Sequence, residues 1–302
     1  MQLGMVGLGR MGGSMATRLL KAGHGVTVFD LNPEAVEAVS AAGGTPASSL
    51  DDLVSLLDAP RTVWVMVPSG DITESTVGDL SRLLSSGDTL IDGGNSNYKD
   101  SQRRAAAIAK EGIDYLDAGT SGGVWGLDNG YCLMVGGPRE AYDRALPILK
   151  ALSPDEGGCM HTGPSGSGHY VKMVHNGIEY GLMQAYAEGF ELLAAKKEFN
   201  LDLAEIAETW RHGSVVRSWL LDLSADAFRE DPRLESLSSY VEDSGEGRWT
   251  VDTSVELAVP TPVITAALHA RFRSRQPNPL GGRMLAALRN QFGGHAVRSA
   301  DE

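Results

Sequence analysis

Gly7-Leu8-Gly9-Arg10-Met11-Gly12 joins the end of an apolar, strand-like run, Leu3 to Leu8, to the start of a helix-like segment, Met11 to Ala22. Glycines at these spacings allow the backbone to approach a pyrophosphate, and the N–H groups of the helix start can face it. The pattern alone is weak evidence, because a glycine turn that binds nothing can contain it. Its place between a strand and a helix predicts that these six residues form a dinucleotide-binding turn.

A carboxylate follows at the distance expected for such a site. The next strand-like run, Val26 to Phe29, ends at Asp30, about twenty residues beyond the glycines. Asp30 would accept hydrogen bonds from ribose hydroxyls and repel a 2′-phosphate, and Leu31-Asn32-Pro33 offers no arginine to neutralise one. We therefore expect NAD as the cofactor, with NADP as the alternative. A simpler interpretation is that Asp30 only caps the helix that begins near Pro33.

Short apolar runs alternate with helical segments through the first half of the chain, which is typical of βαβ units and a parallel sheet. Beyond a stretch rich in Gly, Pro and Ser, residues 154–167, helical periodicity dominates. We predict an α/β fold, with a Rossmann-like doubly wound sheet over residues 1–165 and an all-α domain with a C-terminal tail over residues 166–302. Val67, at the end of a predicted strand, is a further candidate cofactor contact. A hairpin is expected around residues 129–135.

The chain of 302 residues carries a formal net charge of −13. Its field would repel nucleic acid and anionic membranes, so neither is an expected partner, and an anionic ligand needs a local cationic pocket. Cys132 and Cys159 are too few for a disulfide framework and lack metal-ligand spacing, so no metal site is predicted. No apolar run is long enough to cross a bilayer and no signal-like segment begins the chain, which favours the cytoplasm.

The stretch from His169 to Tyr180 is predicted to form one helix. One face of this helix carries four polar side chains at i, i+3, i+4 and i+7, namely Lys172, His175, Asn176 and Glu179. A base, an acid and two hydrogen-bonding groups would then line one wall of a site. A solvated face with surface charges is the other interpretation of this spacing.

Two glycine-rich turns follow predicted strands of the first half. They are Asp92-Gly93-Gly94-Asn95-Ser96-Asn97-Tyr98 and Ser121-Gly122-Gly123-Val124. An open α/β sheet binds its ligands where such strands end. Turn chemistry explains the glycines but not their polar neighbours, so both turns are predicted to contact a ligand.

Five motifs together resemble the pattern of 6-phosphogluconate dehydrogenases. They are IDGGNSNY at 91–98, SGGVWG at 121–126, KMVHNGIEYG at 172–181, GRWT at 247–250 and FGGH at 292–295. The resemblance covers nearly the whole chain and is to the short form of the family, which lacks a long second helical half. The wider β-hydroxyacid dehydrogenase family shares only GLGRMG and the SGG turn convincingly.

This resemblance implies oxidative decarboxylation of 6-phospho-D-gluconate to D-ribulose 5-phosphate and CO2, a step of the pentose phosphate pathway, with a nicotinamide dinucleotide (NAD or NADP) as the oxidant. Lys172 would take the proton of the C3 hydroxyl while hydride leaves C3. Its ammonium group would then stabilise the enolate that forms as CO2 departs. Glu179 would protonate C1 of the enediol. A neutral Lys172 near pH 7 requires a lowered pKa for this side chain.

The resemblance also implies the ligand contacts. Substrate contacts would come from Asn95, Ser121, Gly122, Gly123, His175, Asn176, Tyr180 and Arg271, and from Arg289 and His295 in the tail of another subunit. Cofactor contacts would come from Gly7, Leu8, Gly9, Arg10, Met11, Gly12, Asp30, Val67 and Asn95. A homodimer or homotetramer with tail-completed active sites is therefore expected, whereas a merely solvated tail is the simpler interpretation of Arg289 and His295.

One position departs from the family pattern. Where long-form enzymes carry a phosphate-binding lysine before their GxGKWT turn, this chain has Ser244, with Arg248 nearby. Loss of that charge predicts weaker phosphate binding or a slightly different sugar acid. Two rival functions are a non-decarboxylating β-hydroxyacid dehydrogenase and a non-catalytic sensor of a dinucleotide or sugar acid. Release of CO2 would distinguish the decarboxylating enzyme from the first rival, and any turnover would distinguish an enzyme from the second.

Overall fold

The computed structural model describes residues 1–299, and the chain folds as two compact units, Met1–Asn176 and Gly177–Glu302. Both units contain part of the longest helix, α8, which spans Ser167–Ala195. The boundary predicted at residue 165 comes just before this helix, whereas the compact units divide within it.

The first unit is built on one sheet of eight strands in the order β3-β2-β1-β4-β5-β6-β7-β8. The strands are β1 (Gln2–Val6), β2 (Gly25–Phe29), β3 (Thr45–Pro46), β4 (Thr62–Val65), β5 (Thr89–Asp92), β6 (Asp114–Ser121), β7 (Cys132–Gly136) and β8 (Cys159–Gly163). Neighbouring strands are parallel except β6 and β7. The order reverses between β1 and β4, the point at which open α/β sheets bind ligands.

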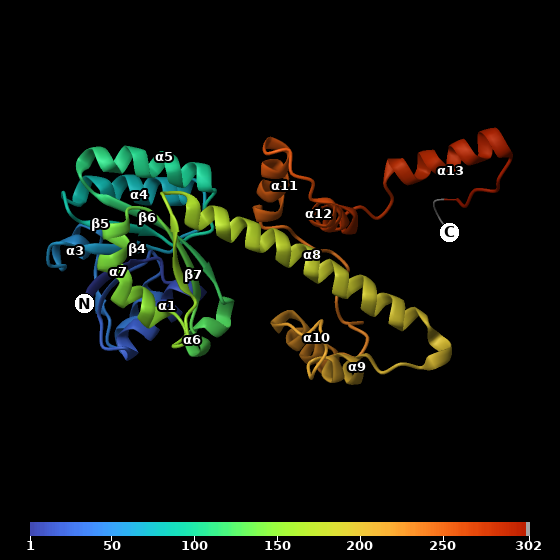
Figure 1. The fold of residues 1–302 in the computed structure, drawn as a ribbon, viewed down its shortest axis with the longest axis horizontal. Coiled ribbons are helices and arrows are strands. Elements are labelled where there is room, and N and C mark those ends of the chain that lie inside the picture. The colour runs from blue at the N-terminus through green and yellow to red at the C-terminus, as the bar shows by residue number, and fades with distance from the viewer. Residues whose placement is uncertain (300–302) are drawn as a thin grey trace. The chain divides into compact units, whose positions relative to one another are not determined.

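Helices cover both faces of this sheet (Figure 1). They are α1 (Arg10–Lys21), α2 (Pro33–Ala41), α3 (Leu50–Ser55), α4 (Asp71–Leu83), α5 (Tyr98–Ile108), α6 (Gly126–Asn129) and α7 (Arg139–Leu152), with 3₁₀ turns η1 (Ala109–Glu111) and η2 (Gly123–Trp125). On one face Met15 of α1 belongs to the same buried cluster as Leu149 of α7. On the other, Leu80 of α4 packs with Leu53 of α3. Burial of the strands on both faces explains their continuous apolar runs.

The hairpin expected around residues 129–135 has a different form. A 3₁₀ turn and the short helix α6 follow β6, and only then does β7 return antiparallel to β6, with Ser121 opposite Cys132. Residues 126–129 are therefore helical, and the antiparallel pair is closed by this short helical connection instead of a tight turn.

The second unit is helical. After α8 come the 3₁₀ turn η3 (Lys197–Phe199), α9 (Leu203–Trp210), α10 (Trp219–Glu230), α11 (Glu246–Glu256), α12 (Pro262–Ser274) and α13 (Leu280–Gly293). Phe190 and Phe228 lie in its larger buried cluster, and Tyr180 and Leu268 in a smaller one. The predicted class, an α/β sheet followed by an all-α domain, is confirmed. Among residues 1–299, no helix has the length and hydropathy needed to span a membrane.

Candidate active site

The glycines of the first turn have different surroundings. Gly7 has φ +91°, and a Cβ there would lie 2.5 Å from the carbonyl oxygen of Met66. A Cβ on Gly12 would lie 1.9 Å from the carbonyl oxygen of Gly7, whereas a Cβ on Gly9 would meet no atom within 4 Å. Gly7 and Gly12 are thus required for the turn and for close helix packing. Open space at Gly9, beside the N-terminus of α1, fits the approach of a pyrophosphate.

Asp30 is attached to this turn. Its carboxylate accepts hydrogen bonds from the backbone N–H of Leu8 at 2.6 Å and of Asn32 at 2.7 Å. The helix α2 is capped instead by Asn32, whose side chain accepts from Glu34 N–H at 3.0 Å. Asp30 therefore joins the end of β2 to the glycine turn, the position from which a carboxylate can reach a ribose.

Asn95 belongs to a turn that is held by a buried carboxylate. Asp92, at the end of β5, is fully buried, while Asn95 is exposed. Four donors contact Asp92: Gly94 N at 3.1 Å, Ser96 Oγ at 2.9 Å, Arg104 Nη1 at 3.1 Å and Tyr115 Oη at 2.8 Å. Burial, with the neighbouring Asp92 charge, raises the pKa of Tyr115, so this phenol stays a donor. The network fixes the backbone on either side of Asn95.

The candidate residues of the first unit gather at one edge of the sheet. Strands β1, β4, β5 and β6 are successive parallel neighbours, so their carboxyl ends share this edge. The glycine turn follows β1, Val67 follows β4, Asn95 follows β5, and Ser121 ends β6. Gly122 and Gly123 come next, with φ values of +134° and +54° that favour glycine.

Lys172 is buried, at 7% exposure, on α8. Its Nζ donates to Asn176 Oδ1 at 2.8 Å, and the same oxygen lies 3.0 Å from Nδ1 of His175. A Cβ on Gly119 of β6 would lie 2.4 Å from Cβ of Lys172, so the helix packs on the strand at this point. Three of the four predicted helix-face residues are thus brought together, and the solvated-face interpretation is wrong for Lys172 and Asn176, which are both buried.

Glu179, Tyr180 and Arg271 lie in the second unit. Glu179 is partly buried, and Tyr180 is 4% exposed. The Tyr180 hydroxyl accepts from Ser244 N–H at 3.0 Å and lies 3.3 Å from Ser244 Oγ. The Arg271 guanidinium stacks 3.4 Å above the Tyr180 ring. Arg248, in contrast, pairs with Asp243 at 2.5 Å. Tyr180, Ser244 and Arg271 therefore form one polar group.

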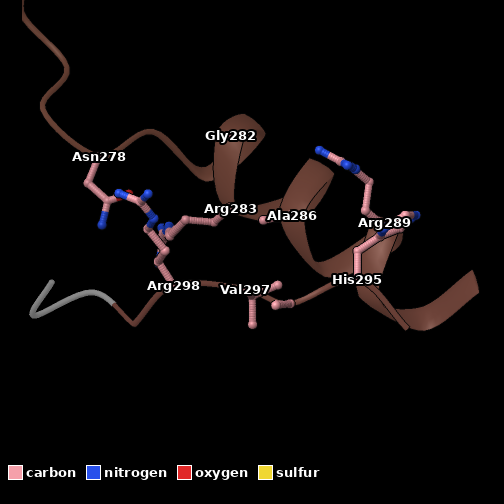
Figure 2. Close-up of a pocket in the computed structure, with 9 residues that line it drawn as sticks. Asn278, Gly282, Arg283, Ala286, Arg289, His295, Val297 and Arg298 are labelled. Carbon is pink, nitrogen blue, oxygen red and sulfur yellow. The ribbon is translucent and has the colours of Figure 1, made fainter. Parts of the chain in front are cut away.

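The tail contains a further cationic pocket (Figure 2). A cavity of about 330 Å³ is lined by Asn278, Gly282, Arg283, Ala286, Arg289, His295, Ala296, Val297 and Arg298. Arg289 and His295 were predicted to act together, whereas Arg283 and Arg298 were missed. The signal that could have found them is the absence of acidic residues from 276 to 299, in a chain that is otherwise acidic. Such a pocket suits an anion.

A glycine turn between β1 and α1, a buried lysine packed on β6 and a helical second unit are typical of dinucleotide-dependent dehydrogenases. Residues 2–163 match the NAD binding domain of 6-phosphogluconate dehydrogenase, and residues 168–280 match the C-terminal domain of 6-phosphogluconate dehydrogenase. The chain belongs to the 6-phosphogluconate dehydrogenase family.

Relatives of two lengths are found. An NAD(+)-dependent, decarboxylating 6-phosphogluconate dehydrogenase of Haloferax volcanii is 48% identical, with 100% of both chains covered. A decarboxylating 6-phosphogluconate dehydrogenase of Synechococcus elongatus is 39% identical over 90% of this chain but only 61% of its own length. The resemblance to a short form of the family is thereby supported.

Solved structures of related dehydrogenases have a similar fold. The Plasmodium falciparum 6-phosphogluconate dehydrogenase, studied with NADP+ and with 6-phosphogluconate, has a TM-score of 0.84 and 28% identity, covering 100% of this chain and 67% of that one. A 3-hydroxyisobutyrate dehydrogenase of Mycobacterium tuberculosis has a TM-score of 0.72 at 23% identity, covering 91% and 92%. The second likeness shows a shared fold alone.

Proposed function

We propose that this protein oxidises and decarboxylates 6-phospho-D-gluconate to D-ribulose 5-phosphate and CO2, reducing NAD. The observation that carries the proposal is the 48% identity, over the full length of both chains, to the NAD(+)-dependent, decarboxylating enzyme of Haloferax volcanii. The buried Lys172 beside the nucleotide-binding edge supplies a base where this chemistry needs one.

The residues present fit a nicotinamide dinucleotide. Open space at Gly9 and the ribose-facing position of Asp30 are the features such a cofactor needs. NAD, when bound, accepts the hydride that leaves C3 of the substrate. Gly7, Leu8, Gly9, Arg10, Met11, Gly12, Asp30, Val67 and Asn95 are proposed to hold it. Asp30 repels a 2′-phosphate, so NAD is preferred to NADP.

Lys172 is proposed to remove the proton from the C3 hydroxyl. Its Nζ shares Asn176 Oδ1 with His175, so the amine is held in one orientation before the substrate binds. Once protonated, Lys172 donates a hydrogen bond to the new C3 ketone oxygen. A β-keto acid loses CO2 readily under this influence, because the developing enolate charge is stabilised.

Glu179 is proposed as the acid that protonates C1 of the enediol, which was C2 of the substrate, after CO2 leaves. It follows Lys172 by seven residues, two helical turns, on the same helix α8. The two groups act in sequence, Lys172 on the oxygen of substrate C3 and Glu179 on substrate C2, which becomes C1 of the product. A non-decarboxylating dehydrogenase has no step that requires the second group.

The substrate contacts are proposed to come from residues of this chain and of a second copy of it. Asn95, Ser121, Gly122, Gly123, His175 and Asn176 would orient the carboxylate and hydroxyls, and Tyr180 and Arg271 would contact the phosphate with Arg289 and His295 of another subunit. Support comes from α13, in which no residue is buried although Leu285, Leu288 and Phe292 are apolar. These side chains have the character of a surface that docks on another copy. We also propose that the protein is a homo-oligomer and that it acts in the cytoplasm.

Substrate comparison tests the proposal. Initial rates with NAD should be at least about 100-fold higher for 6-phosphogluconate than for gluconate or 3-hydroxyisobutyrate, because charge-assisted contacts to the phosphate each contribute about 1.5–3 kcal/mol. Preference for 3-hydroxyisobutyrate without CO2 release would instead identify a small-acid dehydrogenase. Binding of NAD with no turnover on any of the three would favour the sensor.

A further inference from the structure

We propose that Asp117 is a positioning residue for Lys172, acting through the first turn of α8. The inference rests on the proposed function only for the role of Lys172 as the base. Asp117 lies in β6, fully buried. Neither the glycine turns nor the polar helix face includes it.

The Asp117 carboxylate caps α8 from outside the helix. Its Oδ1 accepts from the backbone N–H of Gly166 at 2.6 Å, and its Oδ2 from that of His169 at 2.9 Å. These are amides of the residue before the helix and of its third residue, two of the donors that an α-helix leaves without intrahelical partners. The cap comes from a strand about fifty residues earlier, so it fixes the helix start to the sheet.

The helix start also lies against the sheet at backbone distance. A Cβ on Gly168 would lie 2.2 Å from the carbonyl oxygen of Asp117, and one on Gly136 would lie 2.7 Å from the nitrogen of Gly168. Glycines at both positions allow this approach. The first turn of α8 is therefore held between β6 and β7 by hydrogen bonds and by contact.

One face of β6 connects this cap to the reactive site. Asp117, Gly119 and Ser121 alternate along the strand, so they share a face. Asp117 binds the helix at His169, and Gly119 packs on Lys172, one turn further along α8. Ser121 is the proposed substrate contact at the end of that face. The register of helix against strand thus fixes where the Lys172 side chain begins relative to Ser121.

Burial raises the pKa of the Asp117 carboxyl, so keeping this side chain ionised at neutral pH is unfavourable for the folded state. The backbone hydrogen bonds from His169 and Gly166 lower the pKa and offset part of that cost.

The test compares Asp117→Asn and Asp117→Ala with a matched control, Asp88→Asn. Asp88 is also buried, at 1% exposure, and accepts from Arg61 N at 2.7 Å and Ser85 N at 2.9 Å. It precedes β5, at the opposite end of the strands from the candidate site. Kinetics per folded protomer are measured with 6-phosphogluconate and NAD, and hydrogen exchange is measured for peptides covering residues 164–174.

We expect kcat to fall about 10- to 100-fold in Asp117→Ala, because a displacement near 1 Å costs that much. Asp117→Asn keeps one acceptor oxygen and should lose less. KM for both substrates should stay within about threefold, because binding groups on other elements are unchanged. Asp88→Asn should keep the wild-type kcat. Amide exchange at residues 166–172 should become faster only in the Asp117 variants.

Three outcomes would overturn the positioning role. These are a wild-type kcat in both Asp117 variants, an equal loss of kcat in Asp88→Asn, and a rise in KM with kcat unchanged. Amide exchange tests the cap separately from the kinetics. Unchanged protection of residues 166–172 in Asp117→Asn would show that the Asp117 carboxylate does not hold the start of α8. If wild-type protein releases no CO2 from 6-phosphogluconate, the proposed function fails, while the exchange measurement still decides whether Asp117 holds α8.

Discussion

The Asp30 carboxylate has two roles. It accepts hydrogen bonds from the backbone of Leu8 and Asn32, and it is proposed to face the adenosine ribose. We expect Asp30→Asn to lower the ratio of kcat/KM with NAD to that with NADP by about tenfold, since removing one nearby charge removes about 1.4 kcal/mol of repulsion. Steady-state kinetics with each cofactor measure this ratio. Asp58→Asn, an exposed change in the same unit, is the control. An unchanged ratio would contradict the role given to Asp30.

Residue identity alone could not reveal the surroundings of several important side chains. The motif predicted that Lys172, His175 and Asn176 share a helix face, and they do meet through Asn176 Oδ1. Asp117 was not predicted, because its partners at 166 and 169 are far away in sequence and are backbone groups. Every residue except proline has a backbone N–H, so the residue types at 166 and 169 do not indicate that these groups bind Asp117.

At the scale of an element, alanine substitutions at Gly12 and Gly9 of the glycine turn should have different effects. Gly12→Ala should lower the free energy of unfolding by about 3 kcal/mol, because its Cβ would clash with the carbonyl oxygen of Gly7. Gly9→Ala should leave stability within about 0.5 kcal/mol, because Gly9 has φ −57° and open space.

The affinity for NAD is the second quantity to compare. Gly9→Ala should raise the Kd for NAD at least about tenfold, because the added methyl group occupies the approach of the pyrophosphate. Chemical denaturation and calorimetric titration measure the two effects. Equal NAD affinity in Gly9→Ala and wild-type protein would show that the open space at Gly9 is not the pyrophosphate site.

Helices α4 and α5 are joined by an ion-pair group whose pH dependence can be worked out. The hydrogen bond from Arg103 lowers the pKa of Glu74 from 4.5 to about 2, with further help from Arg104. Because the folded-state pKa is depressed, Glu74 stabilises the fold above pH 4.5, and the stabilisation is lost as the pH falls towards 2. Its side chain is 45% exposed, so the effect is modest.

We expect Glu74→Gln to lower the free energy of unfolding by about 0.5–1 kcal/mol at pH 7, and by less at about pH 3. Urea unfolding of both proteins at the two pH values gives the difference. Glu37→Gln, at an exposed position of α2, is the control. The same difference at both pH values would show that Glu74 contributes by packing and not by charge.

The pattern of elements was largely predictable, because strands buried on both faces must be apolar and α/β helices have regular periodicity. The segment between β6 and β7 was predicted less well. Four residues of helix α6 are too few to show periodicity, and Gly126 is selected by contact with the ring of Tyr131, a tertiary effect. Arg283 and Arg298 likewise become neighbours of Arg289 only through the fold of the tail.

At the scale of the whole molecule, each proposed active site is completed by another copy of the chain. Lys172→Met should be inactive, and Arg289→Ala should raise KM for 6-phosphogluconate about 100-fold. In randomly mixed dimers of the two variants, half of the molecules are hybrids, and one site of each hybrid has both residues intact. About a quarter of wild-type activity should therefore return at low substrate concentration.

The control is a mixture of Lys172→Met with Glu179→Gln, whose residues lie on the same helix of one chain. No site in such hybrids has both residues intact, so no activity should return. Coexpression with two affinity tags isolates each hybrid, and the purified Lys172→Met and Arg289→Ala hybrid should have about half of wild-type activity. Recovery in neither mixture would mean that Arg289 serves the site of its own chain.

The central claim, oxidation followed by decarboxylation, is tested most directly with 6-phosphogluconate labelled with ¹³C at C1. Labelled CO2 and reduced cofactor are followed together, with NAD or NADP and no added metal. We predict one labelled CO2 for each NADH, formed faster than with NADP. Reduced cofactor without labelled CO2, or no turnover with either cofactor, would contradict the account.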